Sequence, residues 1–499
     1  MILILYENNK FNKEIEYVFN YICKYIYRLD DNFCIDIYKD ASLNNIDLII
    51  SYGKEKYNNN FDVPQIHIFE SDLFGEEYLK KSSMPPLPLK RYTGSEVQSV
   101  IDEKDLPAIY SGNGNLNKLV EIKENLIETN IDIIASSFFM ITRYEEVVNP
   151  VKDEHDRFPA QASLAYKEGF LDRPIVNEYI ELLWNWIKKL YPIVERSSIW
   201  GEKDFAFFLS HDIDHIYKYG SGLKKALNGI KKIGGAIIKR GDLKEAILNI
   251  KELRKKDPYF IFEDMMEIEE KYNIKSSWYF KVDNNTPGDG DKYFLNELDS
   301  IIEQLTDKGH EIGIHPSYNS YNSEQAMKEE VNKLCNRYEL KNKSFGGRQH
   351  YLRFNVKKTW SIQEKCGLLY DSTLGYADVV GFRAGICHPY KPYDFEKRRA
   401  YDLWEIPLIV MDGTLKQYME LTPQQANEEL TKLIKQVEKY QGIFSLLWHN
   451  TSLDSLWNDW NDLYKDILRT MKKRNLALNN GLNLILQFEN KNIYSSIFR

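Results

Sequence analysis

The sequence is poor in cysteine and has no long apolar run. Its five cysteines are scattered and never form a C-x-x-C pair; they are Cys23, Cys34, Cys335, Cys366 and Cys387. This usage argues against a disulfide framework and against a thiolate metal site, and it is typical of a reducing compartment. No segment approaches the roughly eighteen consecutive apolar residues that a membrane-spanning helix needs.

The sequence also lacks a secretory leader and an excess of positive charge. The start, MILILYENNKFNKE, has only a short apolar run and no basic residues before it, unlike a signal peptide. With 66 Lys and Arg against 74 Asp and Glu, the formal net charge is −8, which argues against a general nucleic-acid binder. We therefore expect a cytoplasmic protein without a nucleic-acid partner.

The chain is too long for one compact core, since 499 residues correspond to two or three domains. Up to about residue 120, short apolar runs alternate with amphipathic stretches, which predicts a small α/β unit. Residues 130–192 look helical around a polar patch at 153–174, which we interpret as a solvated connector rather than a binding loop. We predict an N-terminal domain of unknown function over residues 1–200.

After Trp200 the pattern changes to repeated strand-then-helix units. Apolar runs predict strands, and each is followed by an amphipathic stretch that predicts a helix. The predicted strands are 204–210, 275–282, 310–316, 401–410 and 443–450, and the predicted helices are 258–273, 293–309, 356–367 and 423–442. This alternation predicts a parallel sheet, open or closed into a barrel, over residues 201–499.

Functional side chains follow four of the apolar runs, where the active sites of parallel α/β folds lie. They are the pair Asp212 and Asp214, then His315, then Arg348 with His350, and finally His449. Converging at one edge of the sheet, these residues would form a single site. Each of them alone has an ordinary explanation: a helix cap, a hydrogen-bonded histidine or a surface ion pair.

The two aspartates are the most informative of these residues. Two positions apart in an extended chain, their carboxylates project to one face, where they repel unless a cation or a shared proton lies between them. A divalent metal on one carboxylate would leave the other as a general base. His315 is a candidate ligand for such an ion, Arg348 would keep a carboxylate ionised, and His449 suits a general acid.

Four segments, in this order, resemble the motifs of the polysaccharide deacetylase family, carbohydrate esterase family 4. They are SHDID (210–214), GHEIGIHPSYN (309–319), GGRQHYLRF (346–354) with the later YDST (370–373), and LLWHN (446–450). The resemblance covers about residues 203–455. It implies a distorted (β/α)-barrel with seven strands, preceded here by the smaller N-terminal α/β domain.

The resemblance also implies roles for single residues. Asp212 would be the general base, Arg348 its orienting cation and His449 the general acid, while Asp214 and His315 would bind a divalent metal, with zinc the expected ion. The reaction would be hydrolysis of an N-acetyl group on a sugar. The first 200 residues resemble the uncharacterised domain that accompanies such enzymes in bacterial surface-polysaccharide loci, with FFMITRYEE (138–146) carrying part of the likeness.

Three residues depart from the family pattern. Ile213 separates two aspartates that are usually adjacent, Asn319 stands where a second metal histidine is expected, and His350 stands in place of a proline. One hypothesis is that His350 supplies the missing imidazole and completes an Asp214, His315 and His350 set. The rival hypothesis is a weak or absent metal.

We therefore predict a metal-dependent carbohydrate N-deacetylase acting on a bacterial surface glycan or its precursor. Two alternatives stay open: a metal-independent amide hydrolase on the same barrel, and a catalytically silent sugar-binding module. The strongly basic segment 223–256 has apolar residues at helical spacing. It is interpreted as a solvated helical insertion or as a peripheral contact with the anionic inner membrane.

Overall fold

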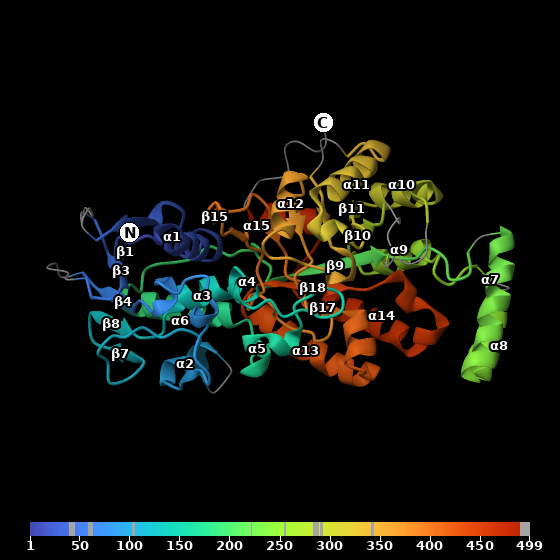
Figure 1. The fold of residues 1–499 in the computed structure, drawn as a ribbon. Coiled ribbons are helices and arrows are strands. Elements are labelled where there is room, and N and C mark those ends of the chain that lie inside the picture. The colour runs from blue at the N-terminus through green and yellow to red at the C-terminus, as the bar shows by residue number, and fades with distance from the viewer. Residues whose placement is uncertain are drawn as a thin grey trace. The chain divides into compact units, whose positions relative to one another are not determined.

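The computed structural model describes residues 1–38, 45–57, 63–101, 105–220, 222–253, 256–282, 289, 293–340 and 344–489. The chain divides into two compact units (Figure 1): Met1–Glu154 with Phe158–Glu202 and Phe382–Asp402, and His155–Arg157 with Lys203–Gly381 and Leu403–Arg499. The predicted boundary at residue 200 is close to this division. However, residues 382–402 belong to the first unit, and three residues of the predicted connector belong to the second.

The N-terminal unit is built on a sheet with the strand order β2-β1-β3-β4-β8-β7, parallel except for the pair β7 and β8. Every residue of β1, β3 and β4 is buried, as expected for parallel strands covered on both faces. The strands are β1 (Ile2–Tyr6), β2 (Phe33–Ile37), β3 (Leu48–Gly53), β4 (Gln65–Phe69), β5 (Lys90–Tyr92), β6 (Leu106–Ala108), β7 (Val120–Ile122), β8 (Leu126–Thr129), β14 (Tyr393–Asp394) and β15 (Arg399–Ala400).

The helices of this unit are mostly short. They are α1 (Asn12–Asn20), α2 (Ser95–Val100), α3 (Ile133–Ile141), α4 (Tyr144–Val148), α5 (Leu164–Lys167) and α6 (Ile175–Leu190). Helix α3 is buried along its whole length and packs against both α1 and α6. A helix that is apolar on all sides is stable only when neighbours cover it.

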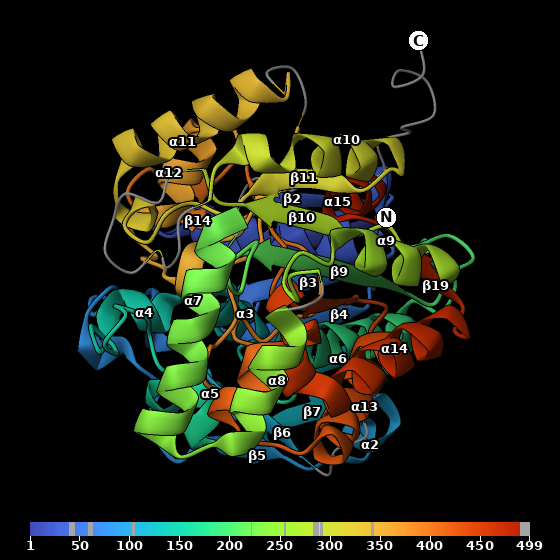
Figure 2. The ribbon, with the colours of Figure 1, turned by 90° about the vertical axis from the view of Figure 1, so that its right-hand side faces the viewer.

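The second unit contains a curled parallel sheet with the order β16-β13-β12-β11-β10-β9-β18-β17, and β19 pairs with β9. Its strands are β9 (Phe205–Ile213), β10 (Ser277–Phe280), β11 (Glu311–Ile314), β12 (Gly346–Gly347), β13 (Tyr370–Asp371), β16 (Trp404–Glu405), β17 (Val410–Met411), β18 (Ile443–Leu447) and β19 (Leu476–Leu478). Figure 2 shows β9, β10 and β11 side by side, with α9 and α10 beside them.

The helices of the second unit connect these strands. They are α7 (Gly222–Gly235), α8 (Leu243–Leu253), α9 (Phe262–Lys271), α10 (Asp299–Asp307), α11 (Glu324–Arg337), α12 (Thr359–Lys365), α13 (Pro423–Lys439), α14 (Asn458–Lys472) and α15 (Gly481–Phe488). Local signals set some of their ends: Thr422 and Gln425 form a capping box at the start of α13, with Pro423 in its first turn.

The curl of the sheet follows from one short connection. The sequence predicts a single strand over 401–410, but the structure has two, β16 and β17, at opposite ends of the strand order. Only residues 406–409 connect them, and a chain of that length spans less than about 20 Å. The two ends of the sheet therefore lie near each other. Within the described residues β16 and β17 do not pair, so the predicted α/β class is confirmed, with a half-barrel rather than a closed ring.

Strand β9 is longer than predicted and brings the first motif into the sheet. It continues to Ile213 and is buried along its whole length. On one edge it pairs with β18 and on the other with β10. In the pairing with β10, Asp212 lies opposite Tyr279. In the part of the chain that the structure describes, no helix is both long and apolar enough to cross a membrane.

Candidate functional site

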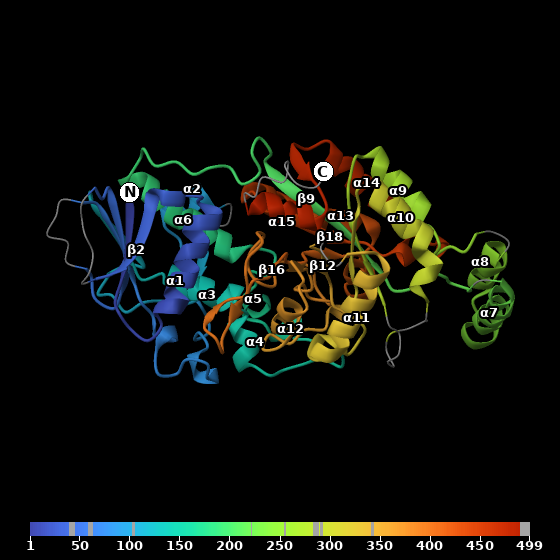
Figure 3. The same ribbon diagram turned by 90° about the horizontal axis from the view of Figure 1, so that it is seen from above.

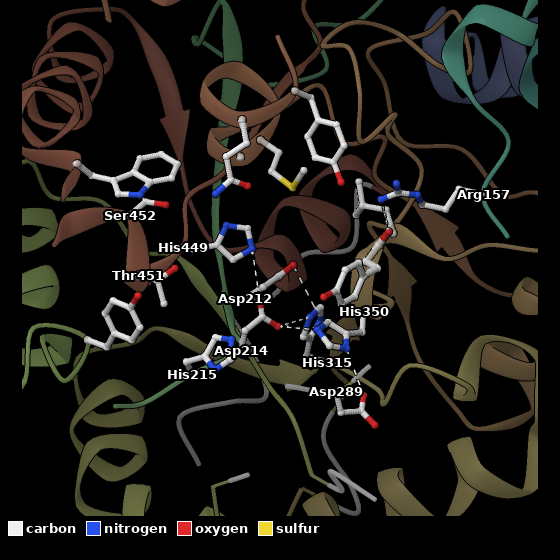
Figure 4. Close-up of a pocket in the computed structure, with 18 residues that line it drawn as sticks. Arg157, Asp212, Asp214, His215, Asp289, His315, His350, His449, Thr451 and Ser452 are labelled. Carbon is white, nitrogen blue, oxygen red and sulfur yellow. Dashed lines mark hydrogen bonds and ion pairs between the residues drawn. The ribbon is translucent and has the colours of Figure 1, made fainter. Parts of the chain in front are cut away.

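A pocket of about 390 Å³ lies at the edge of the curled sheet where its parallel strands end. Its walls include side chains at or just beyond the ends of β9, β11, β12, β17 and β18. Figure 4 shows aspartates and histidines from these ends pointing toward one another. Because all these strands run in the same direction, their carboxyl ends bring residues far apart in the sequence to one place.

Three side chains in the pocket form a compact group of metal-binding type. Asp214, His315 and His350 each offer one ligand atom, and these atoms lie within 4.8 Å of one another. Asp214 Oδ1 is 3.2 Å from His315 Nε2 and 3.0 Å from His350 Nε2. In the described part of the chain this oxygen is buried yet accepts no hydrogen bond, so three donor atoms face a common point.

Neighbouring groups hold both imidazoles in this orientation. His315 Nδ1 donates to the backbone carbonyl of Arg348 over 2.7 Å. His350 Nδ1 donates to Asp289 Oδ1 over 3.2 Å, and this carboxylate also accepts from the backbone N–H of Tyr318 over 2.6 Å. A hydrogen bond from Nδ1 leaves the lone pair on Nε2, which is the arrangement of metal-bound histidines.

Asp212 faces the same pocket but has a different partner. Arg348 is fully buried, and its Nη1 donates to Asp212 Oδ1 and to the Ser210 hydroxyl, each over 2.9 Å. Its Nε and Nη2 donate to the backbone carbonyl and the hydroxyl of Ser372 over 2.7 and 3.0 Å. A guanidinium fixed in this way holds the Asp212 carboxylate in one orientation.

His449 lies near Oδ2 of Asp214, whereas the two other histidines lie near Oδ1. Its Nδ1 donates to Asp412 Oδ1 over 2.7 Å, and its backbone N–H donates to Asp412 Oδ2 over 2.8 Å. Its other ring nitrogen, Nε2, is 3.6 Å from Asp214 Oδ2. The imidazole is therefore held by one carboxylate while Nε2 faces the pocket.

The electrostatics of the pocket favour the protonated form of His449 and the ionised form of Asp214. Burial lowers the pKa of His449, but the Asp412 carboxylate outweighs this effect and raises that pKa to about 10. Burial raises the pKa of Asp214, but the imidazoles of His350 and His315 bring it well below its usual range. Burial likewise lowers the pKa of His350, and Asp214 reverses this, so its pKa is raised. His449 is thus protonated at neutral pH beside an ionised Asp214.

The structure brings together all six residues that the sequence predicted for the site: Asp212, Asp214, His315, Arg348, His350 and His449. Asn319 is exposed, and its amide oxygen accepts from Arg353 over 3.0 Å. It is not a member of the metal-binding group. This placement favours His350 over Asn319 as the residue that completes the set.

Three other histidines lie away from this chemistry. His388 belongs to the N-terminal unit and contacts Asn177 there over 2.8 Å. The alternation along β9 turns His211 to the other face of the sheet, where its Nε2 lies 2.9 Å from Glu269. His310 is buried beside Ser276 and the same glutamate.

The sequence reasoning missed two carboxylates and one arginine. Asp412 follows an apolar run, as the other site residues do, so the same rule would have found it. Asp289 lies between glycines in a polar stretch that gives no such signal. Arg157, from the predicted solvated connector, lines the pocket and donates to the carbonyl of Tyr351 over 3.2 Å.

Comparisons with known proteins give the following similarities. Residues 2–192 match a family of unknown function, DUF7033. No curated protein matches the chain. Among solved structures, a probable polysaccharide deacetylase from Pseudomonas aeruginosa PAO1 is similar with 12% identity and a TM-score of 0.39. The peptidoglycan deacetylase PdaC from Bacillus subtilis is similar with 10% identity and a TM-score of 0.24.

Both alignments cover 58% of this chain and 93% of the other. The two TM-scores are below 0.5, so we base the function on the pocket and not on these similarities.

Proposed function

We propose that this protein is a metal-dependent hydrolase that removes an N-acetyl group from a sugar of a bacterial surface polysaccharide or its precursor. The observation that carries the proposal is the arrangement around Asp214. A three-residue group of metal-binding type lies between an arginine-held carboxylate, Asp212, and a carboxylate-held imidazole, His449. A site that only binds sugars has no need of these three components together.

The donor set fits a divalent ion of the zinc class. One carboxylate oxygen and two imidazole nitrogens are the ligands of many catalytic zinc sites, which keep a further position open. Asp214, His315 and His350 would hold the ion, and the partners on their Nδ1 atoms would fix both rings. Bound there, such an ion supplies a Lewis acid for the amide oxygen and lowers the pKa of a water molecule.

The residues of the chain supply the proton transfers of amide hydrolysis. The Asp212 carboxylate, held in place by Arg348, takes the proton from the attacking water as the new C–O bond forms. The His449 imidazolium, kept protonated by Asp412, gives its proton to the amide nitrogen as the C–N bond breaks. The immediate products are acetic acid, which then ionises to acetate, and the free amine; the proton on Asp212 returns through solvent to His449, so protons and atoms balance.

The pocket walls support a sugar as the substrate. Tyr351 and Tyr418 line the pocket and remain 42% and 45% exposed, so their rings are available to a ligand. Aromatic rings present large apolar faces together with a polar tip, which matches the alternation of C–H faces and hydroxyl groups on a sugar ring. Arg157 lies beside both tyrosines.

The test is metal content together with turnover of N-acetylated sugars. Full-length wild-type protein, dialysed against metal-free buffer and then reconstituted, should hold about one equivalent of zinc or a similar ion. His350→Ala should lose most of this metal and its turnover, because it removes one of three ligands. Asn319→Ala, the matched control, should keep both.

Two results would contradict the proposal. Wild-type protein that binds no divalent ion on reconstitution, yet hydrolyses an amide, would favour the metal-independent hydrolase. Protein that binds sugars but turns over none of them with any divalent ion would favour the silent binding module. Circular dichroism of each variant shows whether loss of metal reflects loss of folding.

A further inference from the structure

The hairpin formed by α7, the following turn Ala236–Arg240 and α8 exposes an unusual amount of apolar surface. Figures 1 and 3 show it projecting beyond the other helices of its unit. Seven of the sixteen exposed large hydrophobic side chains in the described residues lie on it: Leu227, Ile230, Ile237, Ile238, Leu243, Ile247 and Ile250. Ile230 and Ile238 are 67% and 84% exposed. A patch of this kind marks an interaction surface in a folded protein.

These side chains are not the contact between the two helices. The helices meet at Gly229, where an added Cβ would lie 2.3 Å from Leu253, and at the buried Ala236 and Ala246. On α7, Leu227 and Ile230 are three positions apart, so they lie on one helical face. On α8, Leu243, Ile247 and Ile250 recur at spacings of four and three, which again is one face. Each helix therefore carries an apolar stripe beyond its contact with the other helix.

The charge of the hairpin is opposite to that of the whole chain. Residues 222–253 contain eight Lys and Arg and three Asp and Glu, a net charge of +5, within a chain of net charge −8. Lys231, Lys239 and Lys244 are exposed along it. Basic side chains beside an exposed apolar stripe match a surface that offers both negative charge and hydrocarbon, which is an anionic lipid bilayer.

Buried polar contacts fix the base of the hairpin to the unit that holds the pocket. Lys218 Nζ donates to Glu252 on α8 over 2.9 Å and to Asp454 over 3.0 Å. The Tyr219 hydroxyl donates to Asn249 and Glu252 over 2.6 and 2.8 Å. Asp454 follows Thr451 and Ser452, which line the pocket. The stripes are thus carried by an element that is anchored to a residue two positions after Ser452 of the pocket wall.

We propose that the α7–α8 hairpin docks the protein on the surface of a bilayer rich in anionic lipid. The apolar stripes enter the interface between head groups and acyl chains, and the lysines contact lipid phosphates. A second copy of the chain is a poorer occupant, since two hairpins of charge +5 repel each other when they meet face to face. This inference does not depend on the chemistry in the pocket.

The experiment is sedimentation of the full-length protein with lipid vesicles. Wild-type protein should pellet with vesicles of phosphatidylcholine and phosphatidylglycerol in equal parts, and only weakly with phosphatidylcholine alone. Raising the salt to about 1 M shortens the screening length to about 3 Å and should release most of the bound protein. The salt comparison uses the unaltered chain, so it does not depend on the folding of a variant.

Two sets of variants separate the apolar and the charged contributions. The triple variant Ile230→Ser, Ile238→Ser and Leu243→Ser, and the double variant Lys231→Glu and Lys239→Glu, should each bind anionic vesicles at least about tenfold more weakly. The matched controls Ile193→Ser and Lys472→Glu with Lys473→Glu change exposed residues elsewhere and should bind like wild type.

Three outcomes would overturn the proposal. They are equal binding to both kinds of vesicle, no binding to either kind, and an equal loss in the control variants. A dimer in sedimentation velocity that is lost in the triple variant, without vesicle binding by wild type, would assign the hairpin to a second copy instead.

Discussion

Asp212 and Asp214 are two positions apart in the chain, yet the structure gives them different partners. Asp212 contacts the buried guanidinium of Arg348 over 2.9 Å, whereas Asp214 faces the imidazoles of His315 and His350. In the proposed function, the first carboxylate therefore transfers a proton and the second binds the metal. Substitutions at the two positions should therefore have different effects: loss of turnover alone at Asp212, and loss of metal as well at Asp214.

For Asp212→Asn we expect turnover to fall by about 10²- to 10⁴-fold, because the side chain of asparagine cannot take a proton from water. Metal content and sugar binding should stay near the wild-type values, as measured by elemental analysis and calorimetry. Asp214→Ala is the comparison and should lose the metal as well. If Asp212→Asn keeps wild-type turnover, the base is another residue.

Asp412 accepts a hydrogen bond from His449 and favours the protonated form of its imidazole. Burial lowers the pKa of His449, but Asp412, with the charges of Asp214 and Asp212, raises it to about 10, and a general acid works only while it is protonated. Activity of the wild type should therefore persist into alkaline pH, and Asp412→Asn should move the alkaline limb of the kcat/KM profile to lower pH. An alkaline limb in the same place for both proteins would show that His449 is not the acid.

At the scale of secondary structure, the site depends on how closely neighbouring strands approach. In β11, Gly313 lies against β10 and β12: an added Cβ would be 2.4 Å from the backbone oxygen of Gly346 and 2.6 Å from the ring of Tyr279. Distances this short force a strand to move. Gly313 of the GHEIGIHPSYN segment thus has a packing role.

We expect Gly313→Ala to destabilise the second unit by about 1–3 kcal/mol, the usual range for overpacking, and to lower its thermal midpoint. Gly234→Ala in α7 is the matched control, since nothing lies within 4 Å of the added Cβ. That variant should be neutral or slightly stabilising, because alanine favours a helix over glycine. Equal melting curves for both variants would show that the strands can separate at little cost.

At the scale of the whole molecule, the chain returns to its first unit late in the sequence. Residues 382–402 are part of the N-terminal unit, where Arg383 donates to Glu146 over 3.0 and 2.8 Å. Gly385 accepts from the backbone of Val176 over 2.8 Å, and Ile386 and Tyr393 are buried. Cutting the chain after residue 202 therefore removes the part of the first unit that buries residues 382–402.

We predict that a fragment of residues 203–499 is aggregation-prone, because it exposes apolar side chains that the first unit buries. Size-exclusion chromatography with light scattering should show large species for this fragment and not for the full chain. A fragment in which a glycine- and serine-rich linker replaces residues 382–402 should be better behaved. A monomeric, folded 203–499 fragment would contradict this prediction.

The sequence predicted those site residues that are marked by their neighbours in the chain, and it missed those that are defined by contacts with distant residues. Asp212, His315 and His449 stand next to apolar runs, and Asp412 would have been found in the same way, because strand ends are visible in sequence. Asp289 was invisible, since its contact with His350 spans 61 positions in the chain. The connector residues 155–157 looked solvated, because a polar stretch looks the same whether it meets water or a pocket.

By itself the sequence determined the alternation of strands and helices, the parallel direction of the strands and six of the residues at the carboxyl edge of the sheet. These follow from the spacing of apolar residues, which is a property of neighbours in the chain. Only the tertiary structure decided that His350 and not Asn319 faces Asp214, that Asp289 and Asp412 hold the imidazoles, and that residues 382–402 belong to the first unit. Such contacts join distant positions, and the path of the intervening loops that bring them together leaves no periodic signal in the sequence.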